Sequence, residues 1–164
     1  MGSSAGGHLA ALVSTFFDDI DCEIKQDEIE KESFIPDAQI LCYPVIRLLG
    51  KEIAHLGSGA KLLGEKHATC GEDLQPDSLV SEKTPQAFIW HTASDQGVSV
   101  LNSYEYAKSL KKHGIPAEMH IFPDGPHGMG LCDKELLTYL DEKMLAHTSQ
   151  WVELLIKWLK YIGF

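Results

Sequence analysis

The chain has 164 residues, of which 44% are hydrophobic and 23% are charged, and its formal net charge is −10 at pH 7. This length and composition predict one globular domain with a sizeable core. No run of residues approaches the ~18 consecutive apolar residues of a membrane span. No cluster of Lys and Arg offsets the negative charge, so we expect neither a membrane nor a nucleic-acid partner.

Directly after Met1 the sequence reads G-S-S-A-G-G-H, which contains the pattern G-x-S-x-G. Apolar residues then repeat at helical spacing, so a helix is expected over 6–17. A G-x-S-x-G turn between a strand and a helix exposes a serine hydroxyl for attack on a carbonyl. Ser4 is then the candidate nucleophile, and the Ala5 N–H is a candidate oxyanion donor. The alternative is that these glycines and serines only form a loop or a cap.

Strand-like and helix-like segments alternate along the rest of the chain. The acidic residues from Asp18 to Glu32 are interpreted as a solvated insertion. Strands are expected over 38–43, 87–91 and 117–122, and helices over 98–113 and 151–161. Residues 50–80 are expected to hold loops and short helices, including a turn at 61–63. The alternation predicts βαβ units and a parallel sheet, which is the α/β class.

The cysteines stand at positions 22, 42, 70 and 132, with no C-x-x-C pair. This spacing argues against a zinc cluster, and scattered thiols suit a reducing compartment. No basic segment followed by an apolar stretch comes after Met1, so we expect no signal peptide and a cytoplasmic location. Cys42 lies in an apolar run and is expected to be a buried small hydrophobe.

Of the eight histidines, His127 has the setting most typical of a site. Glycines and a proline surround it in the loop after the third expected strand, and a serine nucleophile needs such a base. His8 is expected to orient or to pack. The remaining histidines are expected to be structural (His91 and His120) or at the surface (His55, His67, His113 and His147).

Asp95 follows the second expected strand and is the candidate acid that would hold the base in its tautomer. The alternative is that Asp95 caps the helix that follows. Asp124 is nearer to His127 in sequence, but it shares the loop of His127 and is better suited to stabilising that turn. Ser4, Asp95 and His127 all follow expected strand ends, where open α/β sheets bind their ligands.

Four segments carry a resemblance to the esterase/lipase branch of the α/β-hydrolase superfamily, near acetyl esterases, acetyl-xylan-esterase-like proteins and feruloyl-esterase-like proteins. They are residues 2–10, 36–46, 88–95 and 118–128. The resemblance implies a three-layer α/β/α fold with a mostly parallel sheet. It also implies Ser4 as nucleophile, Asp95 as acid and His127 as base. The implied reaction is hydrolysis of small acyl esters, often acetyl groups on carbohydrate, without a metal or an organic cofactor.

Members of this branch have several strands and a His-Gly-Gly loop before the nucleophile turn, and nothing here matches them. Even the strand that leads into Gly2 is expected to be missing apart from Met1. We therefore expect residues 1–164 to form one hydrolase-like domain, a C-terminal fragment that begins at the nucleophile elbow. The absent loop would donate the second oxyanion N–H. The chain alone is thus expected to be a weak catalyst and to self-associate through an exposed sheet edge.

Other functions stay open at this point. A non-catalytic hydrolase-like domain would act by association with itself or a partner through the open edge. A peptidase or a lactone hydrolase would use the same triad, because triad geometry does not choose among acyl substrates. Metal dependence through His120, Asp124 and His127 is the least favoured alternative, because zinc sites usually show tighter His/Cys pairing.

Overall fold

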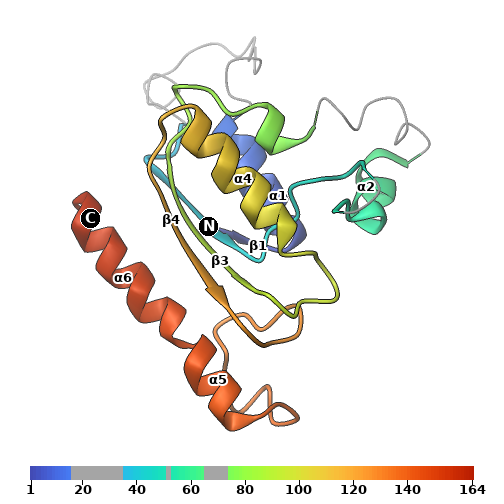
Figure 1. Ribbon diagram of the computed structural model, residues 1–164, viewed down its shortest axis with the longest axis vertical. Coiled ribbons are helices and arrows are strands. Elements are labelled where there is room, and N and C mark those ends of the chain that lie inside the picture. Colours follow the sequence, from blue (N-terminus) through green and yellow to red (C-terminus); the bar gives the residue numbers. More distant parts are fainter. Residues whose placement is uncertain (16–34, 51–52, 65–73) are drawn as a thin grey trace, which may run out of the picture.

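A parallel four-stranded sheet forms the centre of the protein, in the order β1-β2-β3-β4 (Figure 1). The computed structural model describes residues 1–15, 35–50, 53–64 and 74–164. The strands are β1 (Gly2–Ser3), β2 (Ala38–Cys42), β3 (Gln86–Thr92) and β4 (Ala117–Phe122). The three strands expected from the sequence and their parallel pairing are confirmed. The acidic residues 18–32 lie outside the described residues, as do Cys22, Cys70 and His67.

The helices are α1 (Ala5–Thr15), α2 (Leu56–Leu63), the short 3-10 helix η3 (Pro76–Ser78), α4 (Leu101–Lys112), α5 (Glu142–Thr148) and α6 (Gln150–Ile162). The expected helices match α1 as far as Thr15, α4 and α6. The turn expected at 61–63 is the end of α2. The sequence reasoning missed α5, whose first turn is capped by the Asp141 carboxylate accepting from the Met144 N–H at 2.9 Å.

The two faces of the sheet bury different sets of side chains. Because successive residues of a strand point to opposite faces, Ala87 and Ile89 of β3 share one face and Phe88 and Trp90 share the other. The first face packs against α1 and α4 through Ala11, Tyr106 and Leu110. The second packs against α6 through Trp151, Leu155 and Trp158. Figure 1 shows α6 across the sheet from α1 and α4, which confirms the expected three-layer α/β/α fold.

A short strand, β1, lies directly before the turn at Ser4. Gly2 and Ser3 form β1 and pair in parallel with Leu41 and Cys42 of β2. This short pairing is stable because the turn that follows is bonded to the same strand: the Ser4 N–H donates to the Cys42 carbonyl at 3.0 Å. β1 is thus a strand of only two residues, held to β2 both by its own pairing and by the turn that follows it.

The register of the sheet brings three loops to one edge. Ser3 pairs with Cys42, Cys42 with Trp90, and Thr92 with Phe122, so the strands end close to one another. The loops that carry Ser4, Asp95 and His127 leave the sheet at these ends. Parallel sheets of this kind bind ligands at that edge.

Cys42 is buried, as the apolar run around it predicted. Burial raises the pKa of its thiol to about 11, although contacts with Trp90 and the chain's amino terminus act in the opposite direction. In the part of the chain that the structure describes, no helix is long and apolar enough to cross a lipid bilayer.

Candidate active site

Ser4 lies at the sharp turn between β1 and α1 and has a backbone φ of 54°. This left-handed conformation costs roughly 1–2 kcal/mol for a residue with a side chain. Neighbouring backbone offsets the cost: the Ser4 carbonyl accepts from the Val45 N–H at 3.0 Å and from the His8 N–H at 3.2 Å. The segment after β2 therefore holds the turn in its strained form.

Two glycines of the turn are required by close packing. A Cβ atom on Gly2 would collide with the backbone of Gly6, and one on Gly7 would lie 2.8 Å from the Cβ of Pro44. A Cβ on Gly6 would meet nothing within 4 Å among the described residues. Of the glycines in G-S-S-A-G-G, Gly2 and Gly7 thus allow α1 to approach the strands, whereas Gly6 does not.

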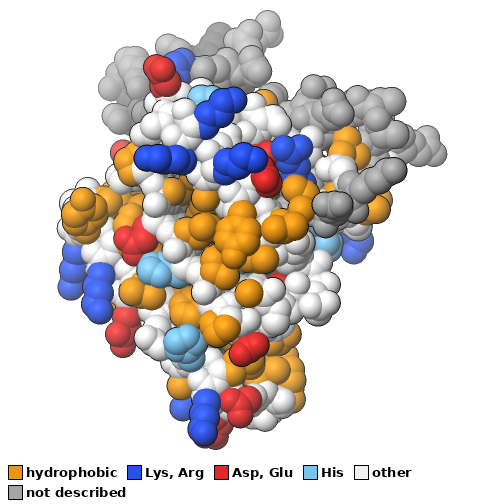
Figure 2. Space-filling view, viewed as in Figure 1, with side chains coloured by type: hydrophobic (Ala, Val, Ile, Leu, Met, Phe, Trp, Pro, Cys, Tyr) orange, Lys and Arg blue, Asp and Glu red, His pale blue; other side chains and the backbone are white. Residues whose placement is uncertain are grey.

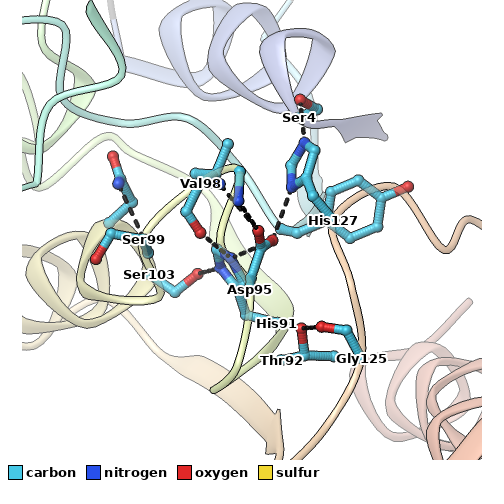
Figure 3. Close-up of polar contacts among 12 residues, drawn as sticks. Ser4, His91, Thr92, Asp95, Val98, Ser99, Ser103, Gly125 and His127 are labelled. Atoms are coloured by element: carbon cyan, nitrogen blue, oxygen red, sulfur yellow. Dashed lines mark hydrogen bonds and ion pairs between the residues drawn. The ribbon is translucent and has the colours of Figure 1, made fainter.

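The structure brings the three residues singled out from the sequence into one hydrogen-bonded line (Figure 3). The Ser4 Oγ lies 2.7 Å from His127 Nε2, and His127 Nδ1 lies 2.7 Å from Asp95 Oδ2. A carboxylate only accepts hydrogen bonds, so Nδ1 carries the hydrogen. In the neutral ring, Nε2 is then free to accept the Ser4 hydroxyl hydrogen. A histidine held in this way by a carboxylate can take the proton of a serine hydroxyl.

Asp95 is buried and held on both carboxylate oxygens. Oδ1 accepts from the N–H groups of Gly97 at 2.8 Å and Val98 at 2.9 Å. Burial acts to raise the pKa of this carboxyl, but hydrogen bonds from His127, His91 and those two N–H groups outweigh burial, and the pKa lies well below its usual range. The charged form of Asp95 is therefore strongly favoured.

The alternative role of Asp95 as the cap of α4 is not what the structure shows. The residue before α4 is Val100, which makes no side-chain cap. Asp95 instead closes the turn at 95–98, before that helix begins. The same carboxylate thus shapes its own loop through Oδ1 and faces His127 through Oδ2.

The loop before His127 is fastened to the end of β3. The Thr92 hydroxyl donates to the Gly125 carbonyl at 2.7 Å, and the Ser94 Oγ accepts from the Gly125 N–H at 2.9 Å. Gly97 faces the His127 side chain so closely that a Cβ atom on Gly97 would lie 2.8 Å from the His127 Cβ. The Asp95 and His127 loops therefore fit against each other without intervening side chains.

The loop after His127 is fastened by aromatic side chains from two other elements. The Gly130 N–H donates to the Tyr43 hydroxyl at 3.1 Å, and the Trp151 Nε1–H donates to the Gly130 carbonyl at 3.1 Å. The Tyr43 ring also meets the His127 ring edge to face, at 5.1 Å between centroids. These contacts limit how far the imidazole can move away from Ser4.

Ala5 is the first residue of α1, next to Ser4, and is exposed. The first hydrogen bond of this helix runs from the His8 N–H to the Ser4 carbonyl. The N–H groups at the start of a helix have no acceptor within it and carry partial positive charge. The Ala5 N–H is one of these helix-start donors.

Sequence reasoning did not predict the contacts of His91 and Tyr43 at the site. His91 is buried, as expected of a structural histidine, and its Nε2 also lies 3.2 Å from Asp95 Oδ2. The available signal was its position four residues before Asp95. Tyr43 directly follows β2, and its φ of 38° marks it as a second strained residue beside the site.

The other described histidines have local partners. His8 is buried and its Nδ1 lies 3.2 Å from the Val45 carbonyl, which agrees with the packing role expected for it. Burial lowers the pKa of His8, although its backbone contact acts to raise it. His120 lies 2.8 Å from the Glu118 carboxylate, away from Asp95. Among the described residues, no group of three or more His, Cys, Asp and Glu side chains could hold a metal ion.

Two hollows flank the hydrogen-bonded line. One of about 510 Å³ lies beside His127, and its lining mixes apolar side chains such as Leu140 and Met144 with the polar Asp124 and Asp141. The other, of about 360 Å³, lies beside Ala5 and is lined mostly by apolar side chains of α1 and α2. A hollow of mixed character therefore lies on the His127 side, and an apolar hollow lies on the Ala5 side.

Comparison with known proteins identifies relatives of this arrangement. The model of the BD-FAE family matches residues 1–110. An endo-1,4-beta-xylanase B of Butyrivibrio fibrisolvens is 36% identical over 141 residues, which are 84% of this chain and 21% of that protein. An acetylxylan esterase of Xylanibacter ruminicola is 30% identical over 135 residues, which are 79% of this chain and 25% of that protein.

Among solved structures, an acetyl ester-xyloside bifunctional hydrolase from Caldicellulosiruptor lactoaceticus is similar over 99% of this chain, with 45% identity and a TM-score of 0.81. This chain covers 56% of that structure. It thus spans about half of the solved structure and a quarter or less of the two curated relatives.

Proposed function

The chain belongs to the BD-FAE family, and from that premise we propose that it is a serine hydrolase of small carboxylic esters that acts through Ser4, His127 and Asp95. The observation that carries the proposal is the pair of 2.7 Å contacts on the two nitrogens of the His127 ring. The resemblance to esterases named as acting on acetyl esters supports the substrate class.

The proposed reaction has two stages. In the first, the Ser4 hydroxyl attacks the ester carbonyl carbon while His127 Nε2 takes its proton, and the Ala5 N–H stabilises the oxyanion. His127 then gives that proton to the leaving alcohol, which departs and leaves an acyl group on Ser4. In the second, His127 deprotonates a water that attacks the acyl carbon, and His127 then gives that proton to the Ser4 oxygen as the bond between Ser4 and the acyl carbon breaks and the acid leaves. Asp95 stays ionised throughout and holds the Nδ1–H of His127.

The leaving alcohol is proposed to lie in the hollow beside His127, because His127 must reach its oxygen. That hollow presents the carboxylates of Asp124 and Asp141 and the ring of Tyr139. Carboxylates accept hydrogen bonds from hydroxyl groups, and an aromatic ring packs on an apolar face. An acetylated sugar, with free hydroxyl groups to donate and an apolar ring face, therefore suits this mixed hollow. The proposed chemistry needs neither a metal nor an organic cofactor.

Acetate release from 4-nitrophenyl acetate and from acetylated xylo-oligosaccharide tests this proposal. Ser4→Ala is expected to abolish release from both substrates, since the nucleophile is gone. Ser78→Ala, which changes an exposed serine of η3, is the control and is expected to keep activity. Release by Ser4→Ala at the rate of the unaltered chain would contradict the proposal.

The chain of 164 residues by itself is proposed to turn over slowly. Among the described residues we assign one oxyanion donor, the Ala5 N–H. Loss of one of two such donors typically lowers kcat by about 10²–10³. We also propose that a second copy of the chain is a partner, through apolar side chains near β1.

A further inference from the structure

We infer that His91 is a positioning residue for the proposed hydrolase: its Nε2–H fixes the Asp95 carboxylate against His127. This inference rests on the proposed function of Ser4, His127 and Asp95. It concerns a histidine that takes no part in the proton transfers described above.

The His91 ring is completely buried in β3, and both of its nitrogens have partners. Nε2 lies 3.0 Å from the Val98 carbonyl oxygen and 3.2 Å from Asp95 Oδ2, as Figure 3 shows. Both partners are acceptors, so Nε2 must carry the hydrogen. In the neutral ring Nδ1 is then an acceptor, and the Ser103 hydroxyl, 2.8 Å away, donates to it.

With this hydrogen bond, every acceptor site of the Asp95 carboxylate is used. A carboxylate offers roughly four acceptor sites, about two on each oxygen. Oδ1 accepts from the N–H groups of Gly97 and Val98, and Oδ2 accepts from His127 and His91. Rotation of the carboxylate would break several of these bonds at once. The two imidazoles thus share one oxygen, and only His127 also contacts Ser4.

Water cannot take the place of His91. The Asp95 side chain is 1% exposed and the His91 side chain is 0% exposed. Without His91, Oδ2 would keep His127 as its only protein partner, and a buried charge that loses a hydrogen bond is costly. The carboxylate would then shift toward its remaining donors, and His127 would be held less well toward Ser4.

Ser103 extends this arrangement to α4. Its hydroxyl lies 2.8 Å from Nδ1 of His91, the ring nitrogen that does not contact Asp95. Ser103 is itself fully buried on α4. The first turn of α4 therefore adds a third contact that holds the His91 ring in place.

The test compares His91→Phe, which keeps a ring but has no donor, with His91→Gln, whose amide nitrogen can reach the position of Nε2. Three measurements are made on the full chain. They are kcat and KM with 4-nitrophenyl acetate, the rate of labelling by a fluorophosphonate, and the downfield proton NMR signal of the His127 Nδ1–H. We expect His91→Phe to lower kcat and the labelling rate about tenfold, with KM unchanged and the proton signal shifted. We expect His91→Gln to restore most of the rate and the signal.

The inference is overturned if His91→Phe keeps the kcat and proton signal of the unaltered chain. It is also overturned if both variants lose activity equally, since that indicates a merely structural role. Ser4→Ala separates the two proposals: activity that survives Ser4→Ala refutes the proposed function, whereas activity lost there but kept in His91→Phe refutes only the role of His91. If His91→Phe does not fold, nitrogen NMR of the unaltered chain gives the position of the His91 hydrogen. A hydrogen on Nε2 supports the inference, and a hydrogen on Nδ1 overturns it.

Discussion

Two residues of this site have a strained backbone, and a third, Asp95, has a buried carboxylate with hydrogen-bond donors on both oxygens. Ser4 and Tyr43 both have positive φ values, and each directly follows a strand of the sheet. Strained residues of this kind persist only where surrounding contacts determine them. Asp95 shows the same principle for charge, since its buried carboxylate is stabilised by donors on both oxygens.

The low pKa of Asp95 predicts how stability depends on pH. Because the folded pKa lies below the unfolded value of about 4, this carboxyl stabilises the fold above pH ~4, and the contribution is lost as pH falls toward the folded pKa. Asp95→Asn lacks this contribution. The difference in free energy of unfolding between the unaltered chain and Asp95→Asn is expected to be constant from pH 5 to 7 and to shrink below ~4. Urea unfolding across this range measures it, and a difference that grows on acidification would contradict the argument.

The turn glycines predict a matched pair of stability changes. Gly7→Ala places a methyl group against Pro44 and is expected to lower the free energy of unfolding by roughly 1–3 kcal/mol. Gly6→Ala meets open space on the same helix and is expected to leave stability unchanged or to raise it by up to ~1 kcal/mol. Thermal unfolding of the two variants measures these changes in stability. Equal losses in both would mean that packing against Pro44 is not what requires Gly7.

At the scale of elements, the His127 loop depends on β2, β3 and α6 together. β3 fastens its beginning at Gly125, while Tyr43 after β2 and Trp151 of α6 fasten it at Gly130. Loops that carry functional side chains are usually mobile unless a rigid scaffold holds them. The position of His127 thus depends on contacts from three elements that are far apart in the sequence.

Tyr43→Phe tests this fastening. The change removes the hydroxyl that accepts from the Gly130 N–H and keeps the ring that packs on His127. We expect ester turnover to fall several-fold while thermal stability falls by about 1 kcal/mol, the usual net value of one hydrogen bond. Tyr104→Phe, on the exposed side of α4, is the control and is expected to change neither. If Tyr43→Phe turned over esters as fast as that control, the hydroxyl would have no part in holding the loop.

The longer strands and helices could be predicted well from the sequence, because the spacing of their apolar residues can be seen within each segment. β3 appeared as an apolar run and α6 as an apolar stripe, and both begin and end within a residue or two of the expected bounds. The sequence did not predict β1 or α5. β1 is only two residues long, too short to show the alternation of a strand, and α5 is defined mainly by its Asp141 cap. Chain order and strand ends also identified Ser4, Asp95 and His127 as neighbours.

The finer contacts of the site could not be predicted in the same way. The contact of His91 with Asp95 depends on the turn at 95–98, which bends the carboxylate back toward β3. The contact of Tyr43 with His127 depends on strand order and on where the loop lies above the sheet. Both are tertiary effects that leave no periodic signal in the residues themselves.

The molecule as a whole has an apolar region at the β1 edge. Met1, Leu9 and Val13 are 75%, 63% and 42% exposed, and with Ala38 they line a hollow of about 250 Å³. Contiguous exposed apolar surface favours association. Figure 2 shows that another face also exposes apolar side chains, among charged side chains of both signs, with Leu101 and Tyr104 of α4 among the exposed residues.

We expect the chain to self-associate through the β1 edge. Leu9→Glu places a charge in that apolar region and is expected to shift the chain toward monomer. Leu136→Glu, at a leucine outside the region that is even more exposed than Leu9, is the control and is expected to leave association unchanged. Light scattering over a range of concentrations measures both. A monomer at all concentrations, or equal effects of the two variants, would exclude this edge as the contact.

The central claim is that Ser4 is a nucleophile activated by His127, and covalent labelling tests it most directly. The full chain is treated with a fluorophosphonate, and the modified peptide is mapped by mass spectrometry in the unaltered chain and in His127→Gln. The account predicts one adduct, on Ser4, and its loss in His127→Gln. An adduct on Ser3 or on another serine, or labelling of Ser4 that is equally fast without His127, would contradict it.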